Sequence, residues 1–223
     1  MTMIMIMNDP AAVMRLLTWL SPGFPTGAYA YSHGLEWAIE THDIRDGATL
    51  TGWLDDVIAQ GSARTDTILL RHAHRAANDP NALRNIVALA LATAAGRERH
   101  DEALALGRAF MRAASGWGLP DLPEDTPYAV AVGAMAGAHS IEEDITATAY
   151  LQTLASNLIS AAVRLVPLGQ TTGLHTLAAL EPVILHTAAA TKSATLDDLG
   201  GCAFRSDLAA MRHETQYTRL FRS

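Results

Sequence analysis

Histidine and carboxylate side chains are the groups in this sequence that could bind a metal ion or transfer a proton. The chain has nine histidines. His72 and His74 are two residues apart, so on a helix they point about 200° away from each other and cannot share one ion. His139, Glu142 and Glu143 have the spacing that places side chains on one helix face. The same residues are typical of a solvated helix start, where acids complement the helix dipole. We expect the helix start and predict no metal site.

Motifs of the common catalytic centres are absent. A zinc-protease motif cannot extend from His213 and Glu214, because Tyr217 stands where its second histidine belongs. Lys192 is the single lysine and follows no glycine-rich loop, which excludes a phosphate-binding P-loop. Cys202 has no neighbouring base, and the Gly-x-Ser-x-Gly pattern of a serine nucleophile does not occur. We therefore predict no catalytic residue, no cofactor and no enzymatic activity of the chain itself.

A segment rich in proline and glycine near the start of the chain is not typical of a simple linker between helices. It occupies residues 21–36 and reads SPGFPTGAYAYSHGLE. Rigid prolines, conformationally free glycines and two tyrosines predict a fixed loop that leads into a helix. The residues that we expect to build this loop are Ser21, Pro22, Pro25, Gly27, Ser32, Gly34 and Glu36.

Arg164 is a lone charge that follows nineteen uncharged residues. It lies in the segment SNLISAAVRLVPLGQTT, residues 156–172. A charge in such apolar surroundings needs a partner or a route to solvent. Arg164 is therefore a candidate for a contact with another molecule, although a packed helix with a surface arginine gives the same pattern.

The last residues of the sequence combine arginines with aromatic side chains. Residues 211–223 read MRHETQYTRLFRS. Arginine and aromatic residues are frequent anchors of protein interfaces, and they would be exposed on a free tail. We interpret this segment as a tail that becomes ordered on a partner. Its candidate contact residues are Arg212, His213, Glu214, Tyr217, Arg219, Phe221 and Arg222.

Helices must position these segments. Asp9 followed by Pro10 has the pattern of a helix N-terminus, and apolar residues recur at helical spacing through most of the chain. Ser140 and Glu143 form a capping box of the S-x-x-E type, which predicts the start of the longest helix. Pro182 should divide the last long helical stretch into two pieces. No segment shows the alternation of a strand.

Two further features concern how the helices pack. Gly133 and Gly137 lie four residues apart among small side chains, a spacing that lets two helices approach closely. Residues 115–127 hold three prolines and two glycines and form the longest connection, either a loop within one domain or a weak boundary. We predict an all-α, single-domain bundle of about eight to ten helices over residues 1–223, with a flexible N-terminus at residues 1–8.

The charge balance narrows the classes of partner. Sixteen basic and 23 acidic residues give a net charge of -7, which argues against a nucleic acid or an anionic membrane surface. The uncharged residues 145–163 carry many hydroxyl and amide groups, so we predict a buried helix there and no membrane span. The single cysteine excludes an intrachain disulfide and fits a reducing, cytoplasmic location.

Together, the three segments resemble the signature regions of the urease accessory protein UreF family, in the family's order. Arg97 and Glu98 with the helix after them also resemble the family. Thr126 and Pro127 stand where members often have His-Pro, so a role of that histidine does not carry over. The matching motifs are Ser-Pro-x-x-Pro-x-Gly at 21–27 with Ser32-x-Gly-Leu-Glu36, Ser156-Asn-Leu with Pro167-Leu-Gly-Gln170, and Arg212-His-Glu-Thr-x-Tyr217 with Arg219-Leu-Phe-Arg-Ser223.

This resemblance implies an all-α protein that acts through other proteins. A UreF-like chain would bind the accessory protein UreD (UreH), recruit the nickel-carrying GTPase UreG to apo-urease and form a homodimer within that complex. It would control GTP hydrolysis and nickel insertion, so the chemistry would belong to UreG. On this interpretation residues 211–223 face UreD, and Arg164 and Gln170 lie near the dimer or GTPase surface.

Two alternatives stay open at this point. One is a helical enzyme whose site is assembled from distant groups such as His139, Glu142 and Arg164. The other is a structural helical subunit of some other complex.

Overall fold

A computed structural model describes residues 9–223, and in this range the chain contains helices and no strand. The predicted all-α bundle is confirmed, whereas the expectation for residues 1–8 lies outside the described residues. None of the described helices combines the length and apolar character needed to cross a membrane. The helices are α1 Pro10–Trp19, α2 Leu35–Glu40, α3 Gly47–Gln60, α4 Ser62–Arg75, α5 Pro80–Ala92, α6 Arg97–Ala114, α7 Tyr128–Ala138, α8 Glu143–Leu165, α9 Gly169–Ala190 and α10 Phe204–His213, with short 3-10 turns η1 Ala28–Ala30, η2 Ser115–Trp117, η3 Thr191–Ser193 and η4 Leu196–Asp198.

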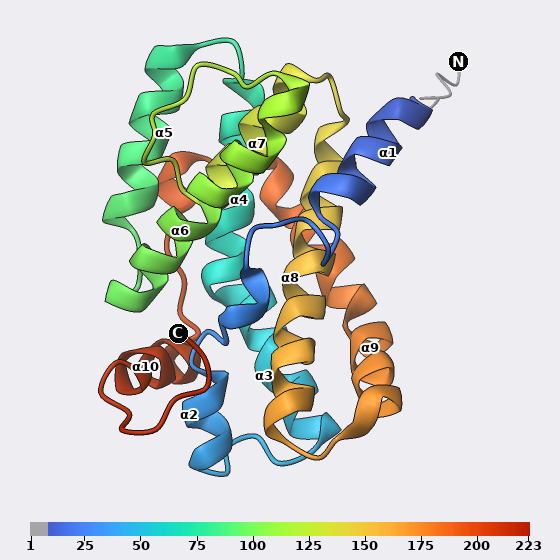
Figure 1. The fold of residues 1–223 in the computed structure, drawn as a ribbon, viewed down its shortest axis with the longest axis vertical. Coiled ribbons are helices and arrows are strands. Elements are labelled where there is room, and N and C mark those ends of the chain that lie inside the picture. The colour runs from blue at the N-terminus through green and yellow to red at the C-terminus, as the bar shows by residue number, and fades with distance from the viewer. Residues whose placement is uncertain (1–8) are drawn as a thin grey trace.

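Helices α4 and α7 lie against each other in the middle of the bundle (Figure 1). A side-chain carbon at Gly133 would lie 2.1 Å from the backbone oxygen of Leu70, and one at Gly137 would lie 2.2 Å from that of His74. The two glycines therefore let the backbones touch, as their spacing predicts. Helices α3, α8 and α9 pack beside this pair and enclose an apolar cluster that includes Leu54, Leu151 and Leu180.

The long connection at residues 115–127 closes a hairpin between α6 and α7. These two helices pack directly against each other, and a side-chain carbon at Gly107 would lie 2.0 Å from the backbone oxygen of Thr126. Arg108 of α6 pairs with Asp125 of the connection. The segment is therefore a loop within the bundle, which was one of the two interpretations left open by its composition.

The predicted capping box of α8 is wrong. Ser140 adopts a left-handed conformation with φ of 54°, and the N–H of Ile141 donates to the carbonyl of Ala136. This is the Schellman arrangement that ends a helix, so Ser140 serves the C-terminus of α7 and is not available to α8. Glu142 caps α8 instead, because its carboxylate accepts the N–H of Ile145 at 2.6 Å.

The predicted break at Pro182 is also wrong, because α9 continues through it from Gly169 to Ala190. A proline in a helix leaves the carbonyl four residues earlier without its donor. Pro182 and Ala178 both lie on the exposed face of α9, where water can satisfy that carbonyl. On the opposite face Leu180 and Ile184 are buried, and this packing holds the helix together.

Helix α10 and the residues after it lie beside α2 and the start of α6 (Figure 1). Residues 204–223 therefore lie next to the start of α6 and the segment before α2, although more than a hundred positions separate them in the sequence. This junction holds most of the residues that the sequence singles out.

Candidate functional site

Residues 211–223, the tail, are packed against their own chain. The backbone N–H groups of Leu220 and Phe221 donate to the carboxylate of Glu36 at 2.7 and 3.0 Å. The Glu36 side chain is buried at the start of α2, so it provides an acceptor that water does not reach freely. The expectation that the tail becomes ordered only on a partner is wrong, because α2 already supplies its hydrogen bonds.

The loop of residues 21–36 supplies a second set of contacts to the tail. The N–H of Ser32 donates to the backbone oxygen of Ser223 at 2.7 Å, and the Ser32 hydroxyl also bonds this oxygen. The N–H of Arg222 donates to the carbonyl of Ala30 at 2.8 Å. The tail and the loop therefore form one packed unit, although almost two hundred residues separate them.

Two glycines of the loop adopt left-handed backbone conformations. Gly27 precedes η1 with φ of 80° and Gly34 precedes α2 with φ of 76°, a region that glycine adopts without strain. A side-chain carbon at Gly34 would also lie 2.5 Å from the backbone nitrogen of Ala210 in α10. Gly34 thus allows α10 to approach the loop. The segment leads directly into α2 at Leu35, as the sequence predicts.

The start of the loop is more open. Ser21 is half-buried and its carbonyl accepts the N–H of Phe24 at 3.0 Å. Pro22 and Pro25 are exposed, whereas Phe24 between them is buried against the aromatic side chains of the core. The prolines therefore stiffen a turn that Phe24 anchors.

His213 is fully buried at the end of α10, between carboxylates of two other helices. Its Nδ1 lies 2.7 Å from Glu98 of α6, and its Nε2 lies 3.3 Å from Glu36 of α2. Glu98 also accepts from Arg219 of the tail at 2.7 Å. These groups join α2, α6, α10 and the tail through charged hydrogen bonds in a site that is largely shielded from water.

Arg164 connects the end of α8 to the same unit. Its guanidinium carbon lies 4.6 Å from the ring centroid of Phe221, within the range of a cation–π contact. One of its terminal nitrogens donates to the carbonyl of Tyr29 at 2.7 Å. The charge that the sequence left without a partner is therefore used between the loop and the tail. Gln170 is exposed in the first turn of α9 and takes part in none of these bonds.

The other predicted tail residues differ in exposure. Glu214 is half-buried and accepts the N–H of Arg97 at the start of α6. His213 and Phe221 are buried within their own chain, so in this conformation they fasten the tail. The exposed members of the predicted set are Arg212, Tyr217, Arg219 and Arg222. Their contact with a partner stays a prediction.

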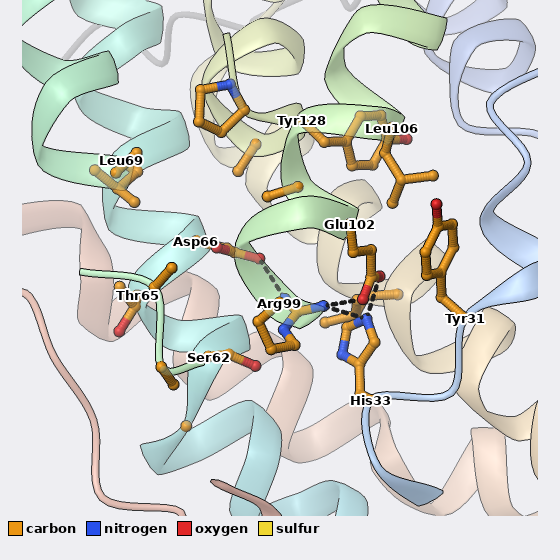
Figure 2. A pocket seen from close by; sticks show the side chains of 18 of the residues that line it. Tyr31, His33, Ser62, Thr65, Asp66, Leu69, Arg99, Glu102, Leu106 and Tyr128 are labelled. Atoms are coloured by element: carbon orange, nitrogen blue, oxygen red, sulfur yellow. Dashed lines mark hydrogen bonds and ion pairs between the residues drawn. The ribbon is translucent and has the colours of Figure 1, made fainter. Parts of the chain in front are cut away.

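Sequence reasoning missed a buried ion network below the tail. Glu102 of α6 accepts from Arg99 at 2.7 Å, lies 2.6 Å from Nε2 of His33 and accepts the Ser223 hydroxyl at 2.8 Å. Arg99 also faces Asp66 of α4 at 3.7 Å (Figure 2). The i, i+3 spacing of Arg99 and Glu102 was the available signal, but the sequence does not indicate that the pair is buried.

This network forms one wall of a cavity of about 300 Å³ between α4, α6, α7 and α8 (Figure 2). Burial alone would raise the pKa of Glu102, but the charge of Arg99 and the contact with His33 outweigh it and lower the pKa to about 2. Burial raises the pKa of Asp66 despite the nearby Arg99. Burial also raises the pKa of Tyr150, whose hydroxyl donates to Asp66. The cavity wall therefore holds one carboxyl with a lowered pKa, Glu102, and one with a raised pKa, Asp66.

The groups of the alternative enzyme hypothesis do not converge. His139 lies in the turn after α7 and bonds Arg15 and the carbonyl of Gly118. Glu142 caps α8, whereas Arg164 lies near the other end of this helix, about 30 Å away at 1.5 Å per residue. Among residues 9–223, no group of three histidine, cysteine, aspartate or glutamate side chains is placed to hold a metal ion.

Comparison with known proteins places the chain among related sequences of nearly equal length. The family model described as UreF matches residues 44–181. Proteins named "Urease accessory protein UreF" are 50% identical in a Bradyrhizobium species, over 96% of this chain and 93% of the relative, and 51% identical in Rhodopseudomonas palustris, over 96% and 94%. A protein of the same name from Mesorhizobium japonicum is 46% identical, over 95% and 96%. The chain therefore belongs to the UreF family.

Proposed function

We propose that this chain is a cytoplasmic urease accessory protein that acts by binding other proteins. It binds UreD (UreH), recruits the GTPase UreG to apo-urease and controls GTP-dependent nickel insertion, and it works as a homodimer within that complex. The family membership and the names of the relatives support the urease-related role. Nickel is the cargo of the complex in this proposal, and the GTPase chemistry belongs to UreG.

The observation that carries the proposal is a surface with exposed apolar groups where the loop, the tail and α8 meet. Tyr29 is 69% exposed and Leu220 is 77% exposed, although the Tyr29 carbonyl accepts from Arg164 and the Leu220 N–H donates to the buried Glu36 carboxylate. Tyr217 is fully exposed. Aromatic and apolar side chains held out by a fixed backbone are typical of interface anchors, because little conformational entropy is lost on binding.

Helix α10 extends this surface towards the predicted UreD side. Phe204, Leu208 and Met211 lie four and three residues apart, so they share one face of the helix, and all three are exposed. Tyr217 and Leu220 follow in the tail. We assign this face to UreD, and we assign the surface around Tyr29 and Arg164 to recruitment of UreG.

Binding assays with exposed residues test the UreD assignment without removing the packed tail. The double substitution of Tyr217→Ala with Leu220→Ala should weaken co-purification with UreD at least about tenfold, as expected for two central anchors. The matched control replaces Leu174 and Leu185, which are similarly exposed on α9. Equal retention of UreD by both double variants would contradict the assignment.

A second assay addresses UreG. Arg164→Ala removes the contacts to Phe221 and Tyr29, so it should reduce UreG recruitment by the complex with UreD. Arg164→Lys keeps the charge but loses the planar stacking, and it should give an intermediate result. Wild-type recruitment and urease activation by the alanine variant would show that Arg164 has no such role.

A further inference from the structure

The cavity between α4, α6, α7 and α8 has an apolar side and a charged side. Its volume of about 300 Å³ corresponds to about ten water molecules in the liquid, so it has room for a guest of about ten non-hydrogen atoms. Apolar walls combined with a few polar groups are typical of sites for small molecules. The apolar side consists of Leu69 of α4, Leu106 of α6, Val130 of α7, and Leu154 and Leu158 of α8.

The cavity has a mouth that opens to solvent. Thr93 and Ala95, between α5 and α6, line the cavity and are exposed. Gly200 and Gly201, in the segment before α10, line it from the other side of the mouth and are also exposed. The cavity is therefore accessible from outside and is not a closed packing defect.

The charged side of the cavity has more carboxyls than guanidinium groups. Asp66 of α4, Glu102 of α6 and Asp207 of α10 line it together with Arg99. Arg99 pairs with Glu102 at 2.7 Å, whereas it lies 3.7 Å from Asp66. Burial raises the pKa of Asp66 and of Asp207 in spite of the charge of Arg99. The charge of these two carboxyls is only partly compensated, which favours a cationic guest.

Two polar groups on this side have unused capacity for hydrogen bonds. Tyr150 and Arg99 both contact Oδ2 of Asp66, so its Oδ1 is available to another donor. His33 is 6% exposed, and among residues 9–223 its Nδ1 has no hydrogen-bond partner. Figure 2 shows the ring edge that carries this nitrogen turned toward Arg99 and Ser62, which also line the cavity. The charged side can therefore accept further hydrogen bonds from a guest.

A small organic ammonium ion matches both sides of the cavity. Its N–H groups are donors for a carboxylate oxygen, and its apolar body suits the leucine-rich wall. The rings of Tyr128 and Tyr150, with centroids 5.8 Å apart, line the cavity and add aromatic faces that attract a cation. A divalent metal ion fits less well, because among the described residues no three histidine, cysteine, aspartate or glutamate side chains are placed to hold one.

We propose that this cavity binds a small organic ammonium ion, a primary amine with a short apolar body. The ammonium group donates to Asp66 on the charged side, and the body lies against the apolar side chains of α6, α7 and α8. This site goes beyond the proposed function, and its test requires neither UreD nor UreG.

Binding of benzylammonium to the full chain tests the proposal. Isothermal titration calorimetry should give a dissociation constant of about 1 mM or lower, as expected for a small ligand. Benzyl alcohol, which is neutral and nearly the same shape, should bind at least about tenfold more weakly, because it lacks the charged hydrogen bond. Phenylacetate and Ni²⁺ alone are the anionic and metal controls. Amide resonances of residues that line the cavity, such as Leu106 and Val130, should shift with benzylammonium.

Three outcomes with the wild-type chain would overturn the proposal. One is the absence of heat and of resonance shifts at concentrations about tenfold above the expected dissociation constant. Another is equal binding of benzyl alcohol and benzylammonium. The third is displacement of benzylammonium by Ni²⁺ with the same resonances shifted, which would make the site a metal site.

Variants place the ligand in the cavity. Asp66→Asn should weaken benzylammonium binding at least about tenfold and leave benzyl alcohol binding unchanged, which also shows that the variant is folded. Asp55→Asn, an exposed change on α3, should bind benzylammonium as the wild-type chain does. Ala103→Leu adds volume inside the cavity and should abolish binding of both compounds. Wild-type affinity for benzylammonium in Asp66→Asn or in Ala103→Leu would overturn the assignment.

Discussion

Substitution of Glu36 by glutamine removes the charge on which the tail is docked. The Glu36 carboxylate is 7% exposed and accepts two backbone N–H groups, from Leu220 at 2.7 Å and from Phe221 at 3.0 Å. It also faces Nε2 of His213. Glutamine has nearly the same shape but offers one acceptor oxygen, and its amide N–H would point at another donor.

The magnitude follows from these bonds. A hydrogen bond to a charged group contributes about 1.5–3 kcal/mol, and a neutral one contributes about 1 kcal/mol. Glu36→Gln loses one charged bond to a backbone N–H and weakens the other, so tail docking should lose about 2–4 kcal/mol. Local opening of the tail need not unfold the bundle, so the loss in global unfolding free energy is at most this value.

Two measurements test the expectation together. Urea denaturation followed by circular dichroism gives the global unfolding free energy, and limited trypsin digestion probes the arginines of the tail, Arg212, Arg219 and Arg222. Trypsin should cleave the tail of the Glu36→Gln variant faster than the tail of the wild-type chain, by a factor of about 30 or more. Glu181→Gln, an exposed change on α9, should behave as wild type in both assays. Unchanged tail cleavage in Glu36→Gln would refute the docking role of this carboxylate.

Three further expectations concern backbone contacts and acid stability. Gly34→Ala should destabilise the chain by about 1–3 kcal/mol, because Gly34 has φ of 76° and a side-chain carbon would lie 2.5 Å from Ala210; denaturation equal to wild type would exclude this clash. Gly133→Ala would place a carbon 2.1 Å from the Leu70 oxygen, so it should also destabilise the chain. Gly52→Ala has open space around the new carbon and should stabilise the chain by about 0.5–1 kcal/mol in the same assay. The pKa of Glu102 is lowered from 4.5 to about 2, so the ionised carboxylate stabilises the fold fully above about pH 4.5, and this stabilisation is lost as the pH falls towards 2. Glu102→Gln should therefore flatten the pH dependence of stability in this range, as measured by thermal denaturation.

Most helices could be predicted because their signals are local. Asp9 caps α1 by accepting the N–H of Ala11, with Pro10 at the first helical position, as the sequence indicates. The close approach at Gly133 and Gly137 also follows from spacing alone, because only small residues let backbones touch. Pattern reasoning was wrong where two elements compete for one residue. Ser140 has a capping sequence for α8, but the end of α7 uses it.

The candidate site was only partly predictable, because its bonds join distant parts of the chain. Composition indicates that Arg164 needs a partner, but not that Phe221 and Tyr29 provide the contacts. The tail's arginines and aromatics suggest an interface, but the backbone N–H groups of Phe221 and Arg222 bind α2 and the loop of their own chain, whereas Tyr217 stays exposed. His33 is the clearest omission, since nothing in its local sequence indicates burial beside Glu102. Such pairs are set by the tertiary packing of α6 against the loop.

Nickel content of urease is the measurement that tests the central proposal most directly. Urease subunits, UreD and UreG would be produced together with and without this chain, and the nickel bound by purified urease would be compared with its activity. The account predicts nickel-loaded, active urease only when the chain is present, with a marked loss for the double substitution of Tyr217 and Leu220. Equal nickel content and activity with and without the chain would contradict its role as an accessory protein of urease.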